Sequence, residues 1–136
     1  MANGILKGKK GIIFGALDDK SIAWKVAEFA HKEGAEIVLT NAPIALRMGT
    51  INELAEKTNS IVIPADATSV EDLTNLYEKS MEHLGGKIDF VLHSIGMSVN
   101  VRKGKAYYEQ NYDWTQKGMD VSATSFHKTI KAAWDL

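Results

Sequence analysis

A glycine and a serine follow the first apolar run of the chain at a spacing that could bind a phosphate group. The run from Gly11 to Gly15 (GIIFG) ends in a glycine, and a helical pattern begins at Ser21. Gly15 would allow a sharp turn, and the free N–H groups at the start of the helix could donate to a pyrophosphate. Ser21 could cap the helix or donate to the phosphate itself. Only the first glycine of a G-x-G-x-x-G pattern is present, so this segment alone is more typical of an ordinary strand-to-helix turn.

The end of the second apolar run bears on the kind of nucleotide that could bind. Glu36 to Thr40 (EIVLT) is followed by Asn41, where NAD-specific dinucleotide domains usually carry an acid for the ribose hydroxyls. The missing acid leaves the choice between NADH and NADPH open. Arg47 follows a few residues later and could meet a 2′-phosphate, although a solvated position on a helix surface is its more typical role.

Asp66 and Ala67 follow the third apolar run, Ser60 to Pro64 (SIVIP). A carboxylate at this place could accept a hydrogen bond from an adenine amino group, while the next backbone N–H could donate to the ring. Alternatively, Asp66 merely begins the next loop. Residue chemistry alone favours neither interpretation.

The fourth apolar run, Ile88 to His93 (IDFVLH), leads into Ser94, Ile95 and Gly96. Gly96 would let the backbone approach a nicotinamide ribose closely. His93 has no second ionisable partner nearby in the sequence, so a packed structural role is favoured over a catalytic one. The other histidines show no metal-ligand spacing, and we predict no metal site.

Composition excludes several classes of protein. The chain has 136 residues, a net charge of −1 and no cysteine, which rules out disulfides and thiolate chemistry and gives no electrostatic footprint for nucleic acid or an anionic membrane. The first residues lack the apolar run of a signal peptide, and no stretch is long enough to span a membrane. We therefore expect a cytoplasmic protein. The three tryptophans are interpreted as packing residues on helix faces.

Strands alternate with helices along the chain. Helical patterns run from Ser21 to Gly34, Leu46 to Thr58, Ser69 to Leu84 and Tyr112 to Trp134, and residues 97–111 are irregular. Ser69 is expected to cap the third helix with Asp72 at the capping-box position. This order predicts an α/β fold of the Rossmann type, a doubly wound parallel sheet with helices on both faces. The expected apolar helix faces comprise Ile22, Ala23, Val26, Ala27 and Ala30 in the first helix and Ile51, Leu54 and Ala55 in the second.

Four short motifs occur in order: GALDDKSIA from Gly15, PADAT from Pro64, LHSIGM from Leu92 and DVSATSF from Asp120. Together they resemble the enoyl-[acyl-carrier-protein] reductases, a divergent branch of the short-chain dehydrogenase/reductase family. In that family the turn reads glycine, five residues, then Ser-Ile-Ala, which the chain matches without a gap. The Ser-Ile-Gly motif is the most distinctive, since ordinary short-chain dehydrogenases more often carry Asn-Ala-Gly there. The resemblance extends from Leu6 to Trp134.

The resemblance implies a role for each matching position. The pyrophosphate and nicotinamide side would be lined by Gly15, Ala16, Ser21 and Ile22. Asp66 and Ala67 would hold the adenine. The ribose and nicotinamide would lie along Ser94, Ile95 and Gly96, with Val121 packed beside the cofactor. Met97 and Ser98 would begin the wall of the acyl-substrate site.

One departure from the family is large. The family places a catalytic tyrosine and a lysine, with six residues between them, after the last helix. The tyrosines here are Tyr77, Tyr107, Tyr108 and Tyr112, and no lysine stands four or seven residues after any of them. We therefore expect no catalytic residue in residues 1–136, which would form the N-terminal dinucleotide-binding part of a single Rossmann domain whose later strands lie outside them. The strand from Ile88 would then be an uncovered sheet edge.

For a complete enzyme, the resemblance implies reduction of a trans-2-enoyl thioester of acyl carrier protein. Hydride would pass from NADH, or from NADPH, to the β-carbon, and the enzyme would be a homotetramer. Two alternatives stay open. A different short-chain dehydrogenase would act on a carbonyl or alcohol and would need a Tyr-x-x-x-Lys spacing. A non-catalytic nucleotide-binding module would bind cofactor without turnover.

Overall fold

The four apolar runs form one parallel sheet. The computed structural model describes residues 2–136, and its strands are β1 (Lys10–Phe14), β2 (Glu36–Thr40), β3 (Ile61–Val62) and β4 (Phe90–His93). Their order is β3-β2-β1-β4, and each neighbouring pair is parallel. The central strand pairs Ile12 with Val38 on one side and with Val91 on the other. The predicted α/β class and the parallel sheet are confirmed, with shorter third and fourth strands than predicted.

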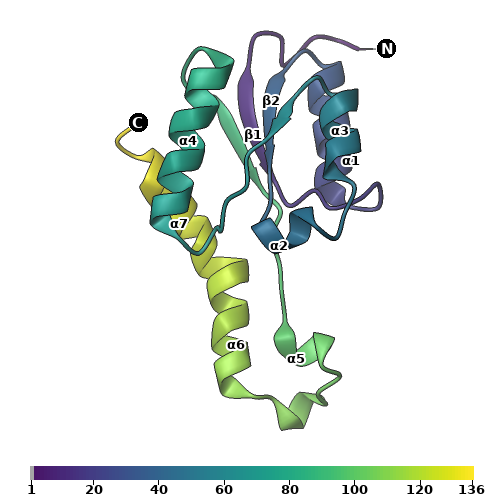
Figure 1. Cartoon of the computed structure of the whole chain (residues 1–136), viewed down its shortest axis with the longest axis vertical. Coiled ribbons are helices and arrows are strands. Elements are labelled where there is room, and N and C mark those ends of the chain that lie inside the picture. Colours follow the sequence, from purple (N-terminus) through teal and green to yellow (C-terminus); the bar gives the residue numbers. More distant parts are fainter. Residues whose placement is uncertain (1) are drawn as a thin grey trace.

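Helices connect the strands and cover both faces of the sheet (Figure 1). They are α1 (Ile22–Lys32), α2 (Pro43–Leu46), α3 (Ile51–Lys57) and α4 (Val70–Leu84). The predicted start of the second helix, at Leu46, is wrong, because two short helices, α2 and α3, take the place of the single predicted helix. The chain breaks at Gly49, where a Cβ would stand 2.2 Å from the Leu17 carbonyl oxygen, and Thr50 donates its N–H to that oxygen at 2.9 Å. This contact with the turn after β1 takes the place of a helical hydrogen bond.

Two apolar cores lie on the two faces of the sheet. On one face, α1 and α3 bury Trp24, Leu54 and Ile51 against Leu39. On the other face, α4 buries Leu73 and Leu76 against Phe14 and Val38, and the end of the last helix adds Ala132. The expected inward positions Ile51, Leu54 and Ala55 are confirmed.

Ser69 caps α4 as predicted, but the second half of the capping box does not form. The Ser69 hydroxyl accepts the N–H of Asp72 at 3.1 Å. The Asp72 carboxylate instead accepts the N–H of Asp66 at 3.0 Å, because Ser69 already donates its own N–H to the Asp66 carbonyl oxygen. The start of α4 is thereby tied to the loop after β3.

The C-terminal part extends away from the sheet and then returns to it (Figure 1). The extension contains α5 (Val99–Arg102), the 3₁₀ turn η1 (Tyr107–Glu109) and α6 (Tyr112–Met119), and α7 (Ser125–Ala133) leads back. A π-helical segment, η2 (Asp120–Thr124), joins α6 to α7, so the predicted long helix is present with a widened turn inside it.

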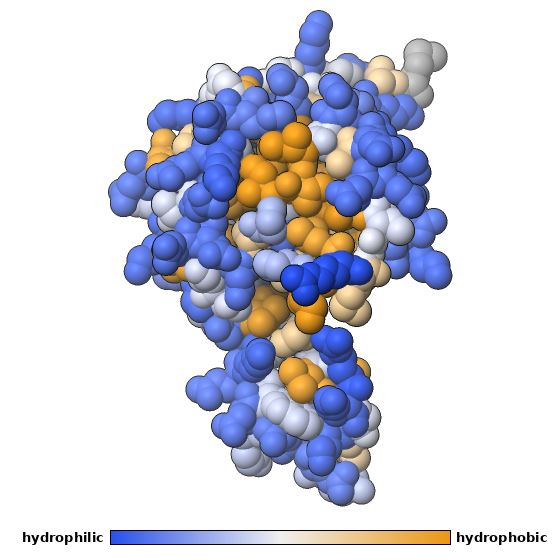
Figure 2. All heavy atoms as spheres, viewed as in Figure 1, coloured by the Kyte–Doolittle hydropathy of each residue, from blue (hydrophilic) through white to orange (hydrophobic). Residues whose placement is uncertain are grey.

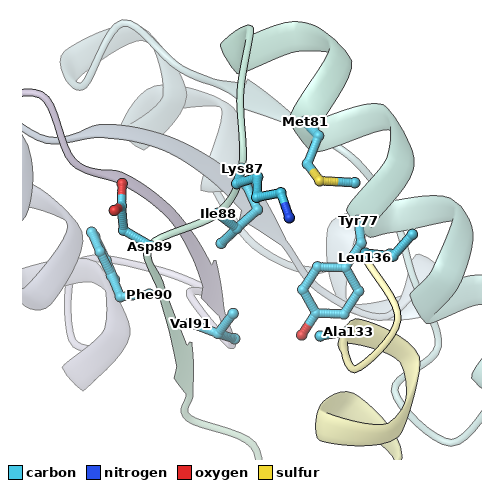
Figure 3. A pocket seen from close by; sticks show the side chains of 9 residues that line it. All are labelled: Tyr77, Met81, Lys87, Ile88, Asp89, Phe90, Val91, Ala133 and Leu136. Carbon is cyan, nitrogen blue, oxygen red and sulfur yellow. The ribbon is translucent and has the colours of Figure 1, made fainter.

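Apolar side chains remain at both edges of the sheet. They are visible between α3 and α4 at the β3 edge (Figure 2). At the β4 edge, Figure 3 shows Val91, Tyr77 and Leu136 around a cavity of about 240 Å³. Trp134 at the end of α7 is 81% exposed, so its predicted packing role is wrong, whereas Trp24 is buried. The uncovered edge predicted for the fourth strand is confirmed within residues 2–136.

No helix in the described part of the chain has the length and apolar character needed to cross a membrane.

Candidate functional site

A cleft of about 560 Å³ lies at the carboxyl ends of the strands. One wall comes from the loops after β2 and β3, and the other comes from the loop after β4 together with α5, α6 and η2. In open parallel α/β sheets ligands bind at this edge, in the crevice that opens where the strand order reverses. The predicted site residues among its lining are Asp66, Ala67, Ile95, Met97 and Val121.

Gly15 lets the segments that follow β1 and β4 approach each other closely. It has a φ of +95°, and a Cβ at this position would stand 1.8 Å from the Ser94 carbonyl oxygen. The neighbouring Ala16 is fully buried. The backbones after the two strands can therefore meet only because residue 15 has no side chain.

Ser21 does not cap α1. Its hydroxyl accepts the N–H groups of Leu17 at 2.9 Å and Asp18 at 3.0 Å, and it makes no cap hydrogen bond. Of the two roles considered for Ser21, the cap is therefore not formed, because the turn after Gly15 folds back over the hydroxyl. The turn is held in shape, and the N–H groups in the first turn of α1 stay without a side-chain acceptor from Ser21.

Ile22 lies outside the cleft and outside the core. Its side chain is 77% exposed, which corrects the expected inward position. It lines a second apolar hollow with Phe29 of α1 and with Phe90 and Val91 of β4. Ile22 faces that side because α1 buries its Ala23, Trp24 and Ala27 face instead.

Asp66 is held in the wall of the cleft by its own loop. Its carboxylate accepts the N–H of Thr68 at 2.9 Å and the Thr68 hydroxyl at 2.7 Å. Ala67, beside it, is buried. The residue both begins the loop and lines the cleft, so the two interpretations left open by its sequence position are compatible.

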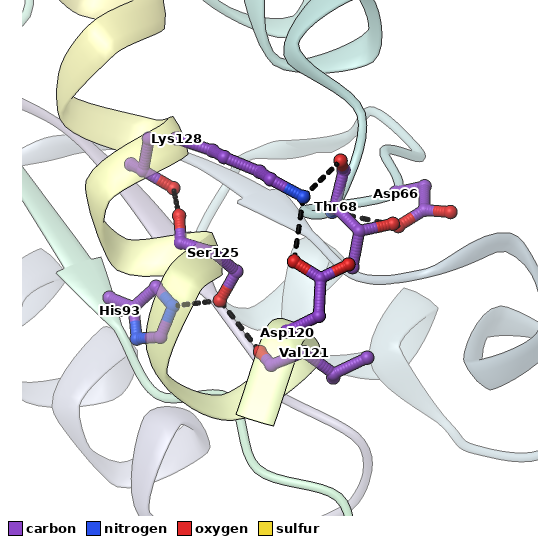
Figure 4. Close-up of polar contacts among 8 residues, drawn as sticks. Asp66, Thr68, His93, Asp120, Val121, Ser125 and Lys128 are labelled. Carbon is purple, nitrogen blue, oxygen red and sulfur yellow. Dashed lines mark hydrogen bonds and ion pairs between the residues drawn. The ribbon is translucent and has the colours of Figure 1, made fainter. Parts of the chain in front are cut away.

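His93 is tied to the last helix (Figure 4). Its Nε2 lies 2.8 Å from the Ser125 hydroxyl, which donates to the Val121 carbonyl oxygen at 2.6 Å. Because the hydroxyl proton goes to that carbonyl, Nε2 donates to the hydroxyl. The ring also packs between Phe14 and Phe126. This geometry agrees with the predicted packed structural histidine.

The remaining predicted residues lie in the loop after β4. Ile95 and Met97 line the cleft, whereas Gly96 is exposed and Ser94 contacts Gly15 through its carbonyl oxygen. Ser98 caps α5 by accepting the N–H of Val101 at 3.3 Å.

Sequence reasoning missed the structural role of Asn41. Its side-chain amide donates to the Ala16 carbonyl oxygen at 2.9 Å and its Oδ1 accepts the N–H of Ala42 at 2.8 Å. Its backbone carbonyl accepts the N–H of Ala65 at 3.1 Å. Asn41 thus joins the loops after β1, β2 and β3. An asparagine directly after a buried strand was the available signal.

Lys128, whose role was also not predicted from the sequence, connects the two walls of the cleft. Lys128 of α7 donates to the Thr68 carbonyl oxygen at 2.9 Å and to Asp120 Oδ1 at 2.6 Å (Figure 4). Thr68 and Asp120 both line the cleft, on opposite sides. Arg102 and Lys117 also face it, so the cleft carries cations as well as the carboxylates of Asp66 and Asp120.

Two features fall outside the site. Burial raises the pKa of Tyr77 to about 12, and its hydroxyl donates to the Thr129 carbonyl oxygen at 3.2 Å, away from the cleft lining. Arg47 is exposed, as its surface interpretation predicted.

Within residues 2–136 no cluster of three or more histidine, aspartate or glutamate side chains could hold a metal ion.

Comparison with known proteins adds to this geometry. A family model described as Enoyl-(Acyl carrier protein) reductase matches residues 15–136. The chain is 37% identical over 135 residues to an enoyl-[acyl-carrier-protein] reductase [NADH] FabI of Rickettsia bellii, covering 98% of this chain and 50% of the relative. It is 31% identical over 134 residues to an enoyl-[acyl-carrier-protein] reductase [NADH] 2 of Rhizobium meliloti, covering 98% and 50%.

Solved structures agree with these relatives. The FabI–NADH complex from Alistipes finegoldii is 66% identical, with a TM-score of 0.94, and the match covers 97% of this chain and 47% of that one. A Bacillus cereus enoyl-acyl carrier protein reductase with NADP+ and an indole naphthyridinone is 28% identical, with a TM-score of 0.84, covering 99% and 52%. The chain therefore spans about half the length of the relatives that it matches.

Proposed function

Because the chain belongs to the enoyl-[acyl-carrier-protein] reductase family, we propose that its protein transfers hydride from NADH to the β-carbon of a trans-2-enoyl thioester carried by acyl carrier protein. The observation that supports this most is the cleft at the carboxyl edge of the sheet. Its lining combines Asp66 and Ala67 on one wall with Ile95, Met97 and Val121 on the other.

The cleft suits a dinucleotide. Its volume of about 560 Å³ and its largely apolar lining match the adenine and nicotinamide rings, and Asp66 supplies an acceptor for an adenine amino group. The free N–H groups at the start of α1 and the Ser21 hydroxyl, beside the turn from Gly15, would donate to the pyrophosphate. When bound, the nicotinamide supplies the hydride.

The residues of this chain would bind and orient the cofactor and the acyl group, and they would not transfer the proton. The enolate formed by hydride addition needs a donor at its oxygen and a proton at the α-carbon. No tyrosine in residues 1–136 has a lysine at the family spacing, so we assign these steps to residues outside this segment. Ile95 and Val121 would pack against the cofactor, and Met97 and Ser98 would begin the wall for the acyl group.

Residues 1–136 would form the N-terminal dinucleotide-binding part of one Rossmann domain. The open β4 edge supports this division, since Val91 is partly exposed there and apolar side chains flank it on both sides. A further parallel strand beside β4 would pair its free backbone groups, and helices would cover Phe29 and Ile130.

The complete enzyme would act as a cytoplasmic homotetramer. The supporting observation is the exposure of the tyrosine side chains on the extension, away from the β4 edge, which are Tyr107, Tyr108 and Tyr112. Such a surface is typical of a subunit contact. The mass of the purified complete protein, measured by light scattering after size exclusion, tests this state: a monomer at micromolar concentration would contradict it.

The proposed function is tested by titrating NADH into the purified 136-residue chain and by following NADH oxidation with a crotonyl thioester. We expect weak, saturable NADH binding and no turnover for the chain, and turnover for the complete protein. Enoyl-thioester turnover by the chain alone would refute the assignment of catalysis to residues outside it. Absence of turnover in the complete protein would refute the reductase activity.

A further inference from the structure

One side chain of the π-helical segment η2 holds the part of the cleft wall that follows β4. The Ser122 hydroxyl accepts the N–H of Met97 at 2.9 Å and lies 3.2 Å from the Met97 carbonyl oxygen, to which it donates. A single hydroxyl thus satisfies both backbone polar groups of one loop residue. Met97 itself lines the cleft.

The π-helical segment sets the position of Ser122. Ser122 lies in the middle of η2 (Asp120–Thr124). π-Helical turns are rare in proteins, and those that occur are often found at functional sites. Three polar side chains in and directly after η2 make hydrogen bonds to different segments around the cleft. Asp120 binds Lys128 and through it Thr68, Ser122 binds Met97, and Ser125 binds His93.

The approach of α6 to the same loop is close. A Cβ on Gly118 would stand 3.0 Å from the Met97 carbonyl oxygen, which is tighter than an ordinary van der Waals contact. The helix therefore lies against the loop at Gly118 and hydrogen-bonds to it at Ser122. Both contacts act on Met97, and neither uses a side chain of the loop.

We propose that Ser122 is a positioning residue, which fixes the backbone at Met97 and thereby the shape of the cleft wall. The inference rests on the proposed function, since the same loop carries Ile95, which would pack against the bound dinucleotide. Without the hydroxyl, the N–H and carbonyl of Met97 turn to water and the loop occupies other positions. The apparent dissociation constant for NADH then rises in inverse proportion to the fraction of molecules with the loop in place.

The test compares Ser122→Ala with Ser122→Thr, which keeps a hydroxyl, and with Thr124→Ala, which changes an exposed residue of the same π segment. Amide hydrogen exchange at Met97 is measured by NMR in each variant, with the amide of Leu92 in β4 as the internal reference. NADH is then titrated into each variant at a temperature well below unfolding. The exchange measurement needs no cofactor.

For Ser122→Ala we expect exchange at Met97 to rise about tenfold and the NADH dissociation constant to rise by about the same factor. Ser122→Thr and Thr124→Ala should stay within about twofold of the unchanged chain on both measurements. Unchanged exchange at Met97 would overturn the proposal. Faster exchange with unchanged NADH affinity would also overturn it, because Ser122 would then have only a structural role.

Failure of the proposed function gives a different result. If the unchanged chain and all variants fail to bind NADH at millimolar concentration, dinucleotide binding by the cleft is refuted. The positioning of Met97 by Ser122 is then decided by hydrogen exchange alone, where a rise confined to Ser122→Ala supports it and no rise overturns it.

Discussion

The contact between Gly15 and Ser94 brings the backbones after β1 and β4 together beside the cleft. Gly15→Ala would place a Cβ 1.8 Å from a backbone oxygen at a φ of +95°, so we expect a loss of about 3 kcal/mol in the free energy of unfolding. Gly104→Ala is the matched control, since Gly104 has a φ of +67° and open space around it. It should lose only about 1 kcal/mol. Urea denaturation measures both, and equal losses would contradict the steric argument.

Asp66 is the residue on which adenine recognition depends. Asp66→Ala removes the proposed acceptor, so we expect the NADH dissociation constant to rise about tenfold. Thr68→Val is the control, because it removes the hydroxyl that Asp66 accepts and leaves the carboxylate. Fluorescence titration with NADH measures both variants. The adenine assignment would be wrong if the Asp66→Ala variant bound as tightly as the control.

At the scale of elements, Asp89 anchors the start of β4 to β1. Its carboxylate accepts the backbone N–H of Lys10 at 2.8 Å, and this bond, with the Lys9 ammonium at 3.3 Å, holds the pKa of Asp89 below its usual value of 3.8. A lowered pKa means that the stabilisation is present above the unfolded-state pKa and is lost as pH falls through the folded-state pKa.

Asp89→Asn should therefore lower the urea midpoint at about pH 6. The difference between the urea midpoints at about pH 6 and at about pH 2 should also be smaller than in the unchanged chain. The reason is that the amide cannot titrate and accepts the Lys10 N–H more weakly than a carboxylate. Glu82→Gln on α4 changes an exposed acid and serves as the control. The same pH dependence in Asp89→Asn as in the unchanged chain would rule out this anchor.

At the scale of the whole molecule, the open β4 edge controls association. Val91 is partly exposed on β4, between the apolar hollow at Ile22 and the one at Ile130. Unpaired strand edges with apolar flanks bind other chains, so the 136-residue chain should self-associate at tens of micromolar and above. Val91→Lys should shift the sedimentation distribution towards the monomer. Thr124→Lys, which places the same charge away from β4, should leave it unchanged, and a monomer at every concentration would contradict the expectation.

Sequence alone predicted the elements whose signals are local. The four strands are short apolar runs bounded by polar residues, and the cap at Ser69 depends on neighbours only three residues away. The motifs at Gly15, Asp66 and Ser94 also indicated the edge of the sheet where the cleft lies. These predictions hold because the carboxyl ends of parallel strands meet at one edge whatever the details of packing.

Tertiary structure decided what depends on contacts between distant residues. The second helix breaks at Gly49 because the turn at Leu17 takes its hydrogen bond, and Ile22 turns outward because α1 buries the face of Trp24. The roles of Asn41, Lys128 and Ser122 required the packed chain, since each has a hydrogen-bond partner 24 or more residues away. Periodicity records which residues are apolar, but only packing determines which backbone groups a polar side chain can reach.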